Sequence, residues 1–203
     1  MPLRPIAWHR EQQSGQILGA SSYPGPALTN SDLNNPVELH APQAYFNKPL
    51  QFASGPGFAS DWLTAWTDAK GKVWFDIEAV APGDYEIELS FACPLAVAGS
   101  RVRISVSGVS METSIPAAPA AEIPLPHRDE AGKAKYRNQK WAMLKVVTFK
   151  LAKGPSKLTL EPLSMPGTQV MDLKQVKLLL QKAKILTFYH GQRAGAAGRA
   201  VCR

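Results

Sequence analysis

The chain has 203 residues, of which 45% are hydrophobic, and its formal net charge is +7. This composition can supply the core of one domain. The 17 prolines and 15 glycines argue against a protein built from long helices, because both residues interrupt regular structure. No stretch approaches the roughly 20 apolar residues of a membrane span. Residues 1–16 contain no apolar segment of the kind a secretion signal needs. We therefore expect neither a membrane span nor a secretion signal in this chain.

The positive charge is concentrated at the C-terminal end. Residues 182–203 contain no acidic side chain and five basic ones, which are Lys182, Lys184, Arg193, Arg199 and Arg203. Residues 1–181 therefore carry a net charge of only +2, and the body of the protein gives no nucleic-acid signal. The tail is short, rich in glycine and without hydrophobic periodicity, so we expect it to be disordered and expect no nucleic-acid partner.

Residues 1–36 are expected to form an irregular segment or linker, because Pro, Ser and Asn dominate "SSYPGPALTNSDLNNP". "VELHAPQAYF" (37–46) follows as the expected entering strand. The clearest pattern then covers 73–93, where apolar and polar residues alternate on both sides of the turn Ala-Pro-Gly-Asp (81–84). Two alternating runs around Pro-Gly predict an antiparallel hairpin with one buried face.

Three more strands are expected after this hairpin. "SRVRISVSG" (100–108) alternates, and two further runs flank the turn Lys-Gly-Pro-Ser (153–156). Between them lies 114–140, rich in Pro and Ala and then in charge, which is expected to be a functional or mobile loop. Cys93 lies within the apolar alternation, and two cysteines are too few for a disulfide framework. We therefore expect Cys93 to be a buried free thiol.

The stretch "PGTQVMDLKQVKLLLQ" (166–181) fits both helical and strand spacing, and periodicity alone does not decide between them. Because every other element is a strand, we interpret it as the last strand, with a β-bulge near Asp172 where the alternation changes phase. The expected fold class is all-β, an antiparallel β-sandwich or jelly roll over 37–181, followed by the basic tail 182–203.

Two long segments resemble a known domain. The run "GKVWFDIEAVAPGDYEIELSFACPLAVAGSRVRISV", followed by "VVTFKLAKGPSKLTLEPLSMPGTQVMDLKQVKLLL", resembles the C-terminal β-sandwich of bacterial arylsulfatase-type sulfatases over about residues 37–181. The same architecture is similar to carbohydrate-binding modules of the galactose-binding-like kind. The resemblance implies an accessory module whose partner is a polysaccharide or a sulfatase-like catalytic domain. It also implies an extracytoplasmic location.

The sequence lacks the parts of a sulfatase catalyst. The Cys/Ser-x-Pro-x-Arg motif that such enzymes carry is absent, and 203 residues cannot hold both a sulfatase catalytic domain and this sandwich. No two of the four histidines have metal-ligand spacing, and no nucleophile elbow, P-loop or Rossmann fingerprint occurs. The chain is therefore expected not to be an enzyme.

Three tryptophans close together are the first candidates for a sugar-binding surface, because aromatic faces stack on pyranose rings. Trp62, Trp66 and Trp74 lie within thirteen positions. Trp74 alternates with the apolar residues on either side of it, so its side chain should point away from the core. There it would either form a binding platform or be covered by the N-terminal segment. For Trp62 and Trp66, packing at the edge of the sandwich is the alternative.

The loop 122–140 supplies a second set of candidates. Arg128, Lys135 and Arg137 could form charge-assisted hydrogen bonds to sulfate or carboxylate groups of an anionic glycan. The alternative is a solvated loop of mixed charge. No cofactor is otherwise expected, but the resemblance to galactose-binding-like modules suggests a structural calcium ion held by Glu38 and Asp172. Calcium needs six to eight oxygen ligands, so backbone carbonyls and water would have to complete such a site.

Two functional hypotheses follow from these features. The first is a non-catalytic accessory module that binds a carbohydrate such as a sulfated polysaccharide. The second is a purely structural or interaction domain that packs against a catalytic domain or another protein. A carbohydrate binder should expose clustered aromatic side chains beside polar groups, whereas a packing domain should expose a broad apolar patch.

Overall fold

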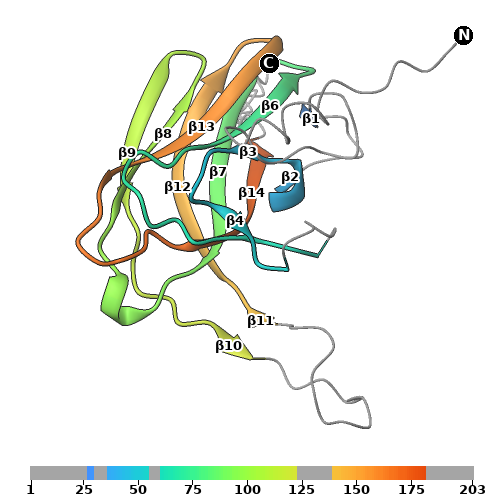
Figure 1. Cartoon of the computed structure of the whole chain (residues 1–203). Helices are drawn as coiled ribbons and strands as arrows, with labels where there is room; N and C mark the ends of the chain where they lie inside the picture. The colour runs from blue at the N-terminus through green and yellow to red at the C-terminus, as the bar shows by residue number, and fades with distance from the viewer. Residues whose placement is uncertain (1–26, 30–35, 55–59, 123–138, 182–203) are drawn as a thin grey trace, which may run out of the picture.

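The computed structural model describes residues 27–29, 36–54, 60–122 and 139–181. Within these residues the chain forms two β-sheets that pack face to face, and no α-helix is present (Figure 1). The described part contains no helix of the length and hydrophobicity needed to cross a membrane. The expected fold class, an antiparallel β-sandwich, is confirmed.

The first sheet, called sheet A here, has the strand order β1-β6-β13-β8-β9, and β3 also pairs with β6. Its strands are β1 (Ala27–Thr29), β3 (Tyr45–Phe46), β6 (Val73–Ala79), β8 (Arg101–Val106), β9 (Val109–Ser114) and β13 (Gly154–Ser164). All the pairs are antiparallel except β1 with β6, which is parallel. Strand β1 lies inside the segment that we expected to be irregular, where it pairs with β6.

The second sheet, sheet B, has the order β12-β7-β14-β5-β4, and β2 also pairs with β14. Its strands are β2 (Val37–His40), β4 (Gln51–Phe52), β5 (Leu63–Thr64), β7 (Gly83–Ala92), β12 (Ala142–Leu151) and β14 (Asp172–Leu180). Two short 3₁₀-helices, η1 (Ala41–Gln43) and η2 (Leu95–Val97), lie between strands. A separate two-stranded ribbon, β10 (Ala121–Glu122) with β11 (Gln139–Lys140), extends from one end of the sandwich.

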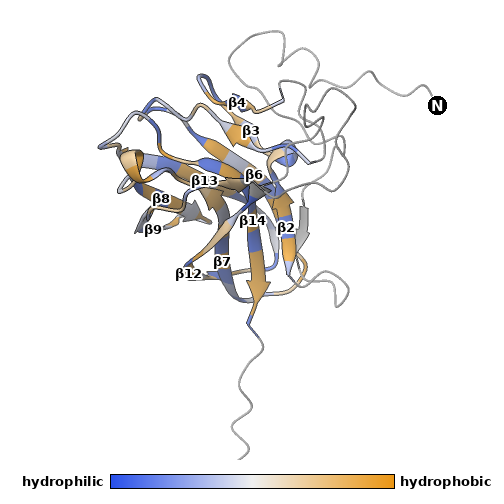
Figure 2. Ribbon diagram, turned by 90° about the horizontal axis from the view of Figure 1, so that it is seen from below, coloured by the Kyte–Doolittle hydropathy of each residue, from blue (hydrophilic) through white to orange (hydrophobic). Residues whose placement is uncertain are grey.

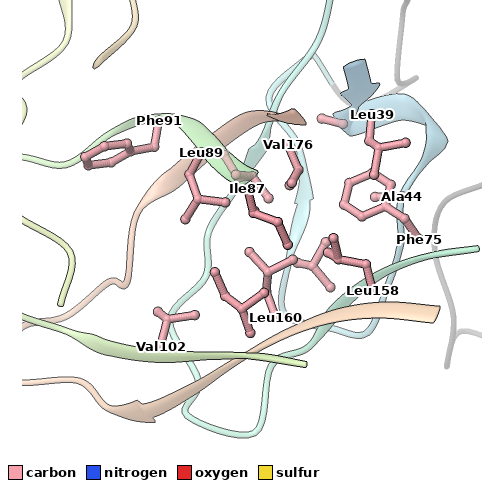
Figure 3. Packing of buried hydrophobic residues seen from close by; sticks show 14 of the residues in the cluster. Leu39, Ala44, Phe75, Ile87, Leu89, Phe91, Val102, Leu158, Leu160 and Val176 are labelled. Atoms are coloured by element: carbon pink, nitrogen blue, oxygen red, sulfur yellow. The ribbon is translucent and has the colours of Figure 1, made fainter. Parts of the chain in front are cut away.

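The core lies between the sheets and is built by period-two alternation. In β6 the side chains of Val73, Phe75 and Ile77 are buried, and in β7 those of Ile87 and Leu89 are buried. Figure 3 shows side chains from both sheets meeting in this layer, and Figure 2 shows hydrophilic and hydrophobic bands along β7 and β14. Since successive side chains point to opposite faces, each strand also presents a polar outer face.

The hairpin predicted over 73–93 is wrong. Strand β6 belongs to sheet A and β7 to sheet B, so the connection at 80–82 crosses from one sheet to the other instead of joining paired strands. Both strands are amphipathic, and they bury their apolar faces by facing each other across the core. The 152–153 connection between β12 and β13 crosses in the same way. Alternation identified these strands but carries no information on which sheet each one joins.

Other expectations are confirmed. The 166–181 stretch contains strand β14, and its register against β7 shifts between Leu173 and Gln175, which is the bulge expected near Asp172. Cys93 is a buried free thiol, and burial raises its pKa, with a smaller contribution from Asp172.

Strand β9 was not predicted. It pairs with β8 along the whole of both strands and forms one edge of sheet A.

Candidate functional site

A row of five outward-facing residues crosses sheet A. Neighbouring strands place Tyr45 beside Trp74, Trp74 beside Thr159, Thr159 beside Ser105 and Ser105 beside Ser110. This set is called the Trp74 row here. It begins with two aromatic rings on β3 and β6 and continues as three small hydroxyl side chains on β13, β8 and β9. The row spans four strand spacings, or about 19 Å.

Trp74 points away from the core, as its parity predicted, and is partly exposed. Its indole stacks on the Tyr45 ring, with ring centres 5.9 Å apart and planes 14° from parallel. The Lys157 ammonium lies 5.9 Å from the centre of the Trp74 ring, within the usual range of a cation–π contact. Because the Lys157 side chain is 60% exposed, its ammonium can leave the ring without losing a buried contact.

One side of the row is bounded by a chain of alternating charges. Arg101 pairs with Glu112, and Glu112 also pairs with Arg103 at 3.4 Å. Arg103 reaches Glu161 at 3.3 Å, and Glu161 accepts a 2.8 Å contact from Lys72. The hydrogen bond and charge of Lys72, with smaller contributions from Arg103, outweigh burial and lower the pKa of Glu161, so this carboxylate is ionised at neutral pH.

On the other side of the row the charged contact is longer. Asp76 lies 4.0 Å from Lys157. Within the row itself, the hydroxyls of Ser105 and Ser110 are 2.8 Å apart. The outer face of sheet A is therefore a strip of small hydroxyl groups between charged borders, with an aromatic pair at one end.

The structure corrects the assignment of Trp66 as a candidate. Trp66 is fully buried in the core, and its Nε1 donates to the Gly71 carbonyl at 3.2 Å. A Cβ atom at Gly71 would lie 2.7 Å from that nitrogen, so glycine allows the backbone to approach the indole closely. A ring without exposed surface cannot stack on a sugar, and Trp66 is a core residue.

Trp62 has a packing partner that the sequence did not indicate. Its ring meets that of Trp141 edge to face, with the ring centres 5.4 Å apart. Trp62 precedes β5 and Trp141 precedes β12, and β7 and β14 lie between those strands in sheet B. The two strands are about 14 Å apart, so the side chains must meet above the intervening strands. Consistent with such a cover, Ala92 and Ser90 on the outward face of β7 are only 1% and 4% exposed.

Glu38 and Asp172 do not come together. Glu38 lies opposite Lys177 on β14, which is five positions from Asp172, or roughly 16 Å along the strand. The Glu38 carboxylate pairs with the Lys177 ammonium at 2.6 Å, and this contact lowers its pKa despite partial burial. One calcium ion cannot bridge these two carboxylates. No group of three or more metal-ligating side chains occurs within the described residues.

Asp172 instead belongs to a hydrogen-bonded cluster on the outer face of sheet B. Its Oδ1 accepts bonds from the Thr64 hydroxyl at 2.7 Å and from Gln169 Nε2 at 2.8 Å. Burial nevertheless dominates and raises the pKa of Asp172 above its ordinary value of 3.8. Nearby, burial lowers the pKa of Lys174, whose ammonium donates to the Ser60 and Asp61 carbonyls.

The basic candidates Arg128, Lys135 and Arg137 lie outside the described residues, and their role stays a prediction.

Tyr45 and Trp141 were not predicted from the sequence. Tyr45 lies 29 positions before Trp74, and only the β3–β6 pairing joins them. The sequence does contain one signal for it, since "AYF" falls in the predicted entering strand.

Comparisons with known proteins identify the fold. No protein-family model and no curated protein match the sequence. Many solved structures match, and three of them are similar to this chain to the following extent. A family 35 carbohydrate-binding module from Clostridium thermocellum has a TM-score of 0.51 and 15% identity, covering 72% of this chain and 99% of its own. A GH26-CBM35 β-(1,4)-mannanase from Podospora anserina has a TM-score of 0.50 and 14% identity, covering 73% of this chain and 28% of its own.

The third structure is the mosquito-larvicidal Cry4Aa toxin from Bacillus thuringiensis, with a TM-score of 0.52, 14% identity, and coverage of 71% of this chain and 23% of the toxin. At such low identities the likeness concerns the fold, which proteins of unrelated function share. The relation to sulfatase accessory domains stays a prediction from the sequence. The chain has the β-sandwich fold found in a family 35 carbohydrate-binding module.

Proposed function

We propose that this chain is a non-catalytic carbohydrate-binding module whose ligand lies along the Trp74 row. The observation that carries the proposal is the row itself, in which an aromatic pair continues in register into three hydroxyl side chains between charged borders. The fold supports the proposal, because a similar structure is by name a carbohydrate-binding module. The site carries more weight than the fold, since fold alone does not determine function.

A sugar ring has an apolar face of C–H groups and a rim of hydroxyls, and the row offers partners for both. The indole of Trp74 packs against the apolar face once the exposed Lys157 ammonium moves aside. The hydroxyls of Thr159 and Ser105 then lie beneath the ring's polar rim. The carboxylate of Glu161 and the guanidinium of Arg103 lie at the border, where they accept from and donate to sugar hydroxyls.

Such a module contributes binding, and a catalytic domain would contribute the chemistry. The Podospora mannanase joins a GH26 domain to a CBM35 domain in one chain, and this chain matches 28% of it. For the present protein, the resemblance to sulfatase accessory domains predicts a sulfatase-like partner. Binding to a sulfated polysaccharide through the basic residues of 122–140 is a second prediction, and it rests on the sequence.

One observation favours the alternative of a docking domain. Val109 and Met111 lie on the edge strand β9 and are 53% and 43% exposed. An edge strand with exposed apolar side chains is a surface on which another domain can pack. This surface does not overlap with the Trp74 row, because the side chains of Val109 and Met111 lie on the opposite face of β9 from Ser110.

The proposal is tested by titrating the protein with a glycan panel in a calorimeter. We expect Trp74→Ala to weaken binding by about tenfold, equivalent to ~1.4 kcal/mol. Trp74→Phe should retain part of the affinity because it keeps an aromatic face. Met143→Ala serves as the matched control, since Met143 is 48% exposed on the outer face of sheet B. Equal affinity of the wild type and Trp74→Ala would refute the proposed site.

A further inference from the structure

We infer that the Trp74 row binds an uncharged, hydroxyl-rich oligosaccharide rather than a sulfated or carboxylated one. This inference rests on the proposed function and names the class of ligand. It differs from the expectation of a sulfated polysaccharide, which depended on the charge of the loop 122–140. The charges on the described outer face of sheet A favour a neutral ligand.

Each basic side chain that borders the row already has a carboxylate partner. Lys72 and Arg103 pair with Glu161, at 2.8 and 3.3 Å. Arg101 pairs with Glu112, and Lys157 lies 4.0 Å from Asp76. On the described part of this face the basic side chains are thus Lys72, Arg101, Arg103 and Lys157, and the acidic ones are Asp76, Glu78, Glu112 and Glu161. Their formal charges cancel.

An anionic ligand is disfavoured on such a face. A sulfate group bound to one of these cations would lie beside the carboxylate that the cation already holds, and repulsion between the two negative charges opposes the attraction to the cation. The effect is strongest at Glu161, because Lys72 and Arg103 both pair with it and its side chain is only 24% exposed. The face therefore offers an anion no net positive charge.

A neutral hydroxyl meets no such obstacle. A carboxylate has about four lone-pair positions and a guanidinium has five N–H donors, so an existing ion pair can accept a third partner. The hydroxyls of Thr159, Ser105 and Ser110 add further donors and acceptors without charge. From Trp74 to Ser110 the row spans three strand spacings, or about 14 Å, and it crosses the strands. The ligand therefore lies across the strands as an extended chain of sugars.

Lys157 offers a direct test, because its ammonium lies over the Trp74 ring. For a neutral ligand, Lys157→Gln should leave affinity unchanged or raise it, since the ligand no longer has to displace an ammonium from the indole. For an anionic ligand the same change removes the cation over the stacking face and should weaken binding. Lys150→Gln is the matched control, because Lys150 is exposed on the outer face of sheet B.

The experiment titrates wild type, Lys157→Gln and Lys150→Gln with pairs of polysaccharides that differ in sulfation, such as dextran with dextran sulfate and agarose oligosaccharides with carrageenan oligosaccharides. Each titration is repeated at low and high salt. We expect binding to one or more neutral members, with less than about twofold change in affinity across the salt series. We also expect that Lys157→Gln does not reduce this affinity.

Two other results would overturn the inference in distinguishable ways. Tighter binding of the sulfated member by roughly tenfold, lost at high salt and in Lys157→Gln, would refute the neutral ligand and leave carbohydrate binding in place. Absence of binding to every member of the panel, for a protein shown to be folded, would refute the proposed function together with the inference.

Discussion

The two outer faces of the sandwich each carry a pair of aromatic side chains, but the pairs have different surroundings. On sheet A, Tyr45 and Trp74 stand at one end of an open row of hydroxyl side chains. On sheet B, Trp62 and Trp141 come from strands on either side of β7 and β14 and meet above them, where Ala92 is 1% exposed. The first pair borders partly exposed polar side chains, whereas the second covers small side chains.

The comparison shows that a cluster of tryptophans in a sequence does not by itself mark a binding site. The three tryptophans at 62, 66 and 74 differ in what surrounds them. Trp66 is in the core, Trp62 packs on another indole, and Trp74 is presented beside small polar residues. What separates these roles is the face on which each ring lies and the distant side chain that it meets. The following predictions test this difference, beginning with the largest expected effect.

Trp141→Ala should destabilise the protein by about 2 kcal/mol. This loss is smaller than the loss expected for a fully buried tryptophan, because Trp141 is partly exposed. The loss arises because removing this ring uncovers Trp62 and the outward face of β7. Unfolding in denaturant measures the change, and glycan affinity should stay the same at a temperature where the variant is folded. If this variant lost glycan binding while remaining folded, the distinction between the two faces would fail.

Thr159→Val should weaken glycan binding by a few-fold, corresponding to about 1 kcal/mol, because valine keeps the shape and removes the hydroxyl beside Trp74. Stability should change little, since valine is well suited to a strand. Thr148→Val is the matched control, because Thr148 is exposed on the outer face of sheet B. An equal effect of the two variants in calorimetric titration would argue against a role for the row.

Asp172→Asn should make the protein more stable at neutral pH. Burial raises the pKa of Asp172 above 3.8, so the folded state binds a proton more tightly than the unfolded state. Stability contributed by the protonated group is therefore lost as pH rises from about 3.8 through the raised pKa. Asparagine can still accept from Thr64 and never ionises. Melting temperatures of wild type and variant should converge below pH 3.8, and a less stable variant at neutral pH would contradict the sign.

Glu161→Gln should have the smallest effect and the opposite pH dependence. The Lys72 and Arg103 contacts lower the pKa of Glu161 below 4.5, so its stabilisation is present above that value and is lost as pH falls through the lowered pKa. The pair lies near the surface, where solvent screening limits the effect to less than about 1 kcal/mol. Melting curves across acidic pH measure it, and the difference from wild type should be greatest at neutral pH. A difference that grew on acidification would reverse the assignment.

Much of the fold follows from local patterns. Alternation in 73–79 and 83–92 predicted both strands and the outward direction of Trp74, because side chains on a strand alternate strictly. The phase change near Asp172 predicted the bulge in β14. The pairing of these strands was not predictable in the same way. Ala-Pro-Gly-Asp (81–84) has the composition of a hairpin turn, yet β6 and β7 pair with strands far away in sequence.

The candidate site depends on those distant pairings. Trp74 meets Tyr45, Thr159 and, across β13, Ser105, and these residues are up to 114 positions apart in the chain. None of the hydroxyl residues has a distinctive pattern around it, because serine and threonine are ordinary on the exposed face of a strand. Only the register between strands shows that they form one row beside an aromatic pair.

The sequence by itself determined the all-β class, the strands with clear alternation, the buried thiol of Cys93 and the outward side of Trp74. These features depend on the conformation of a few consecutive residues, which local composition controls. The tertiary structure decided which sheet each strand joins, the meeting of Trp62 with Trp141, the separation of Glu38 from Asp172 and the assembly of the Trp74 row. These features depend on contacts between distant segments, and the burial of both apolar faces in one common core selects them.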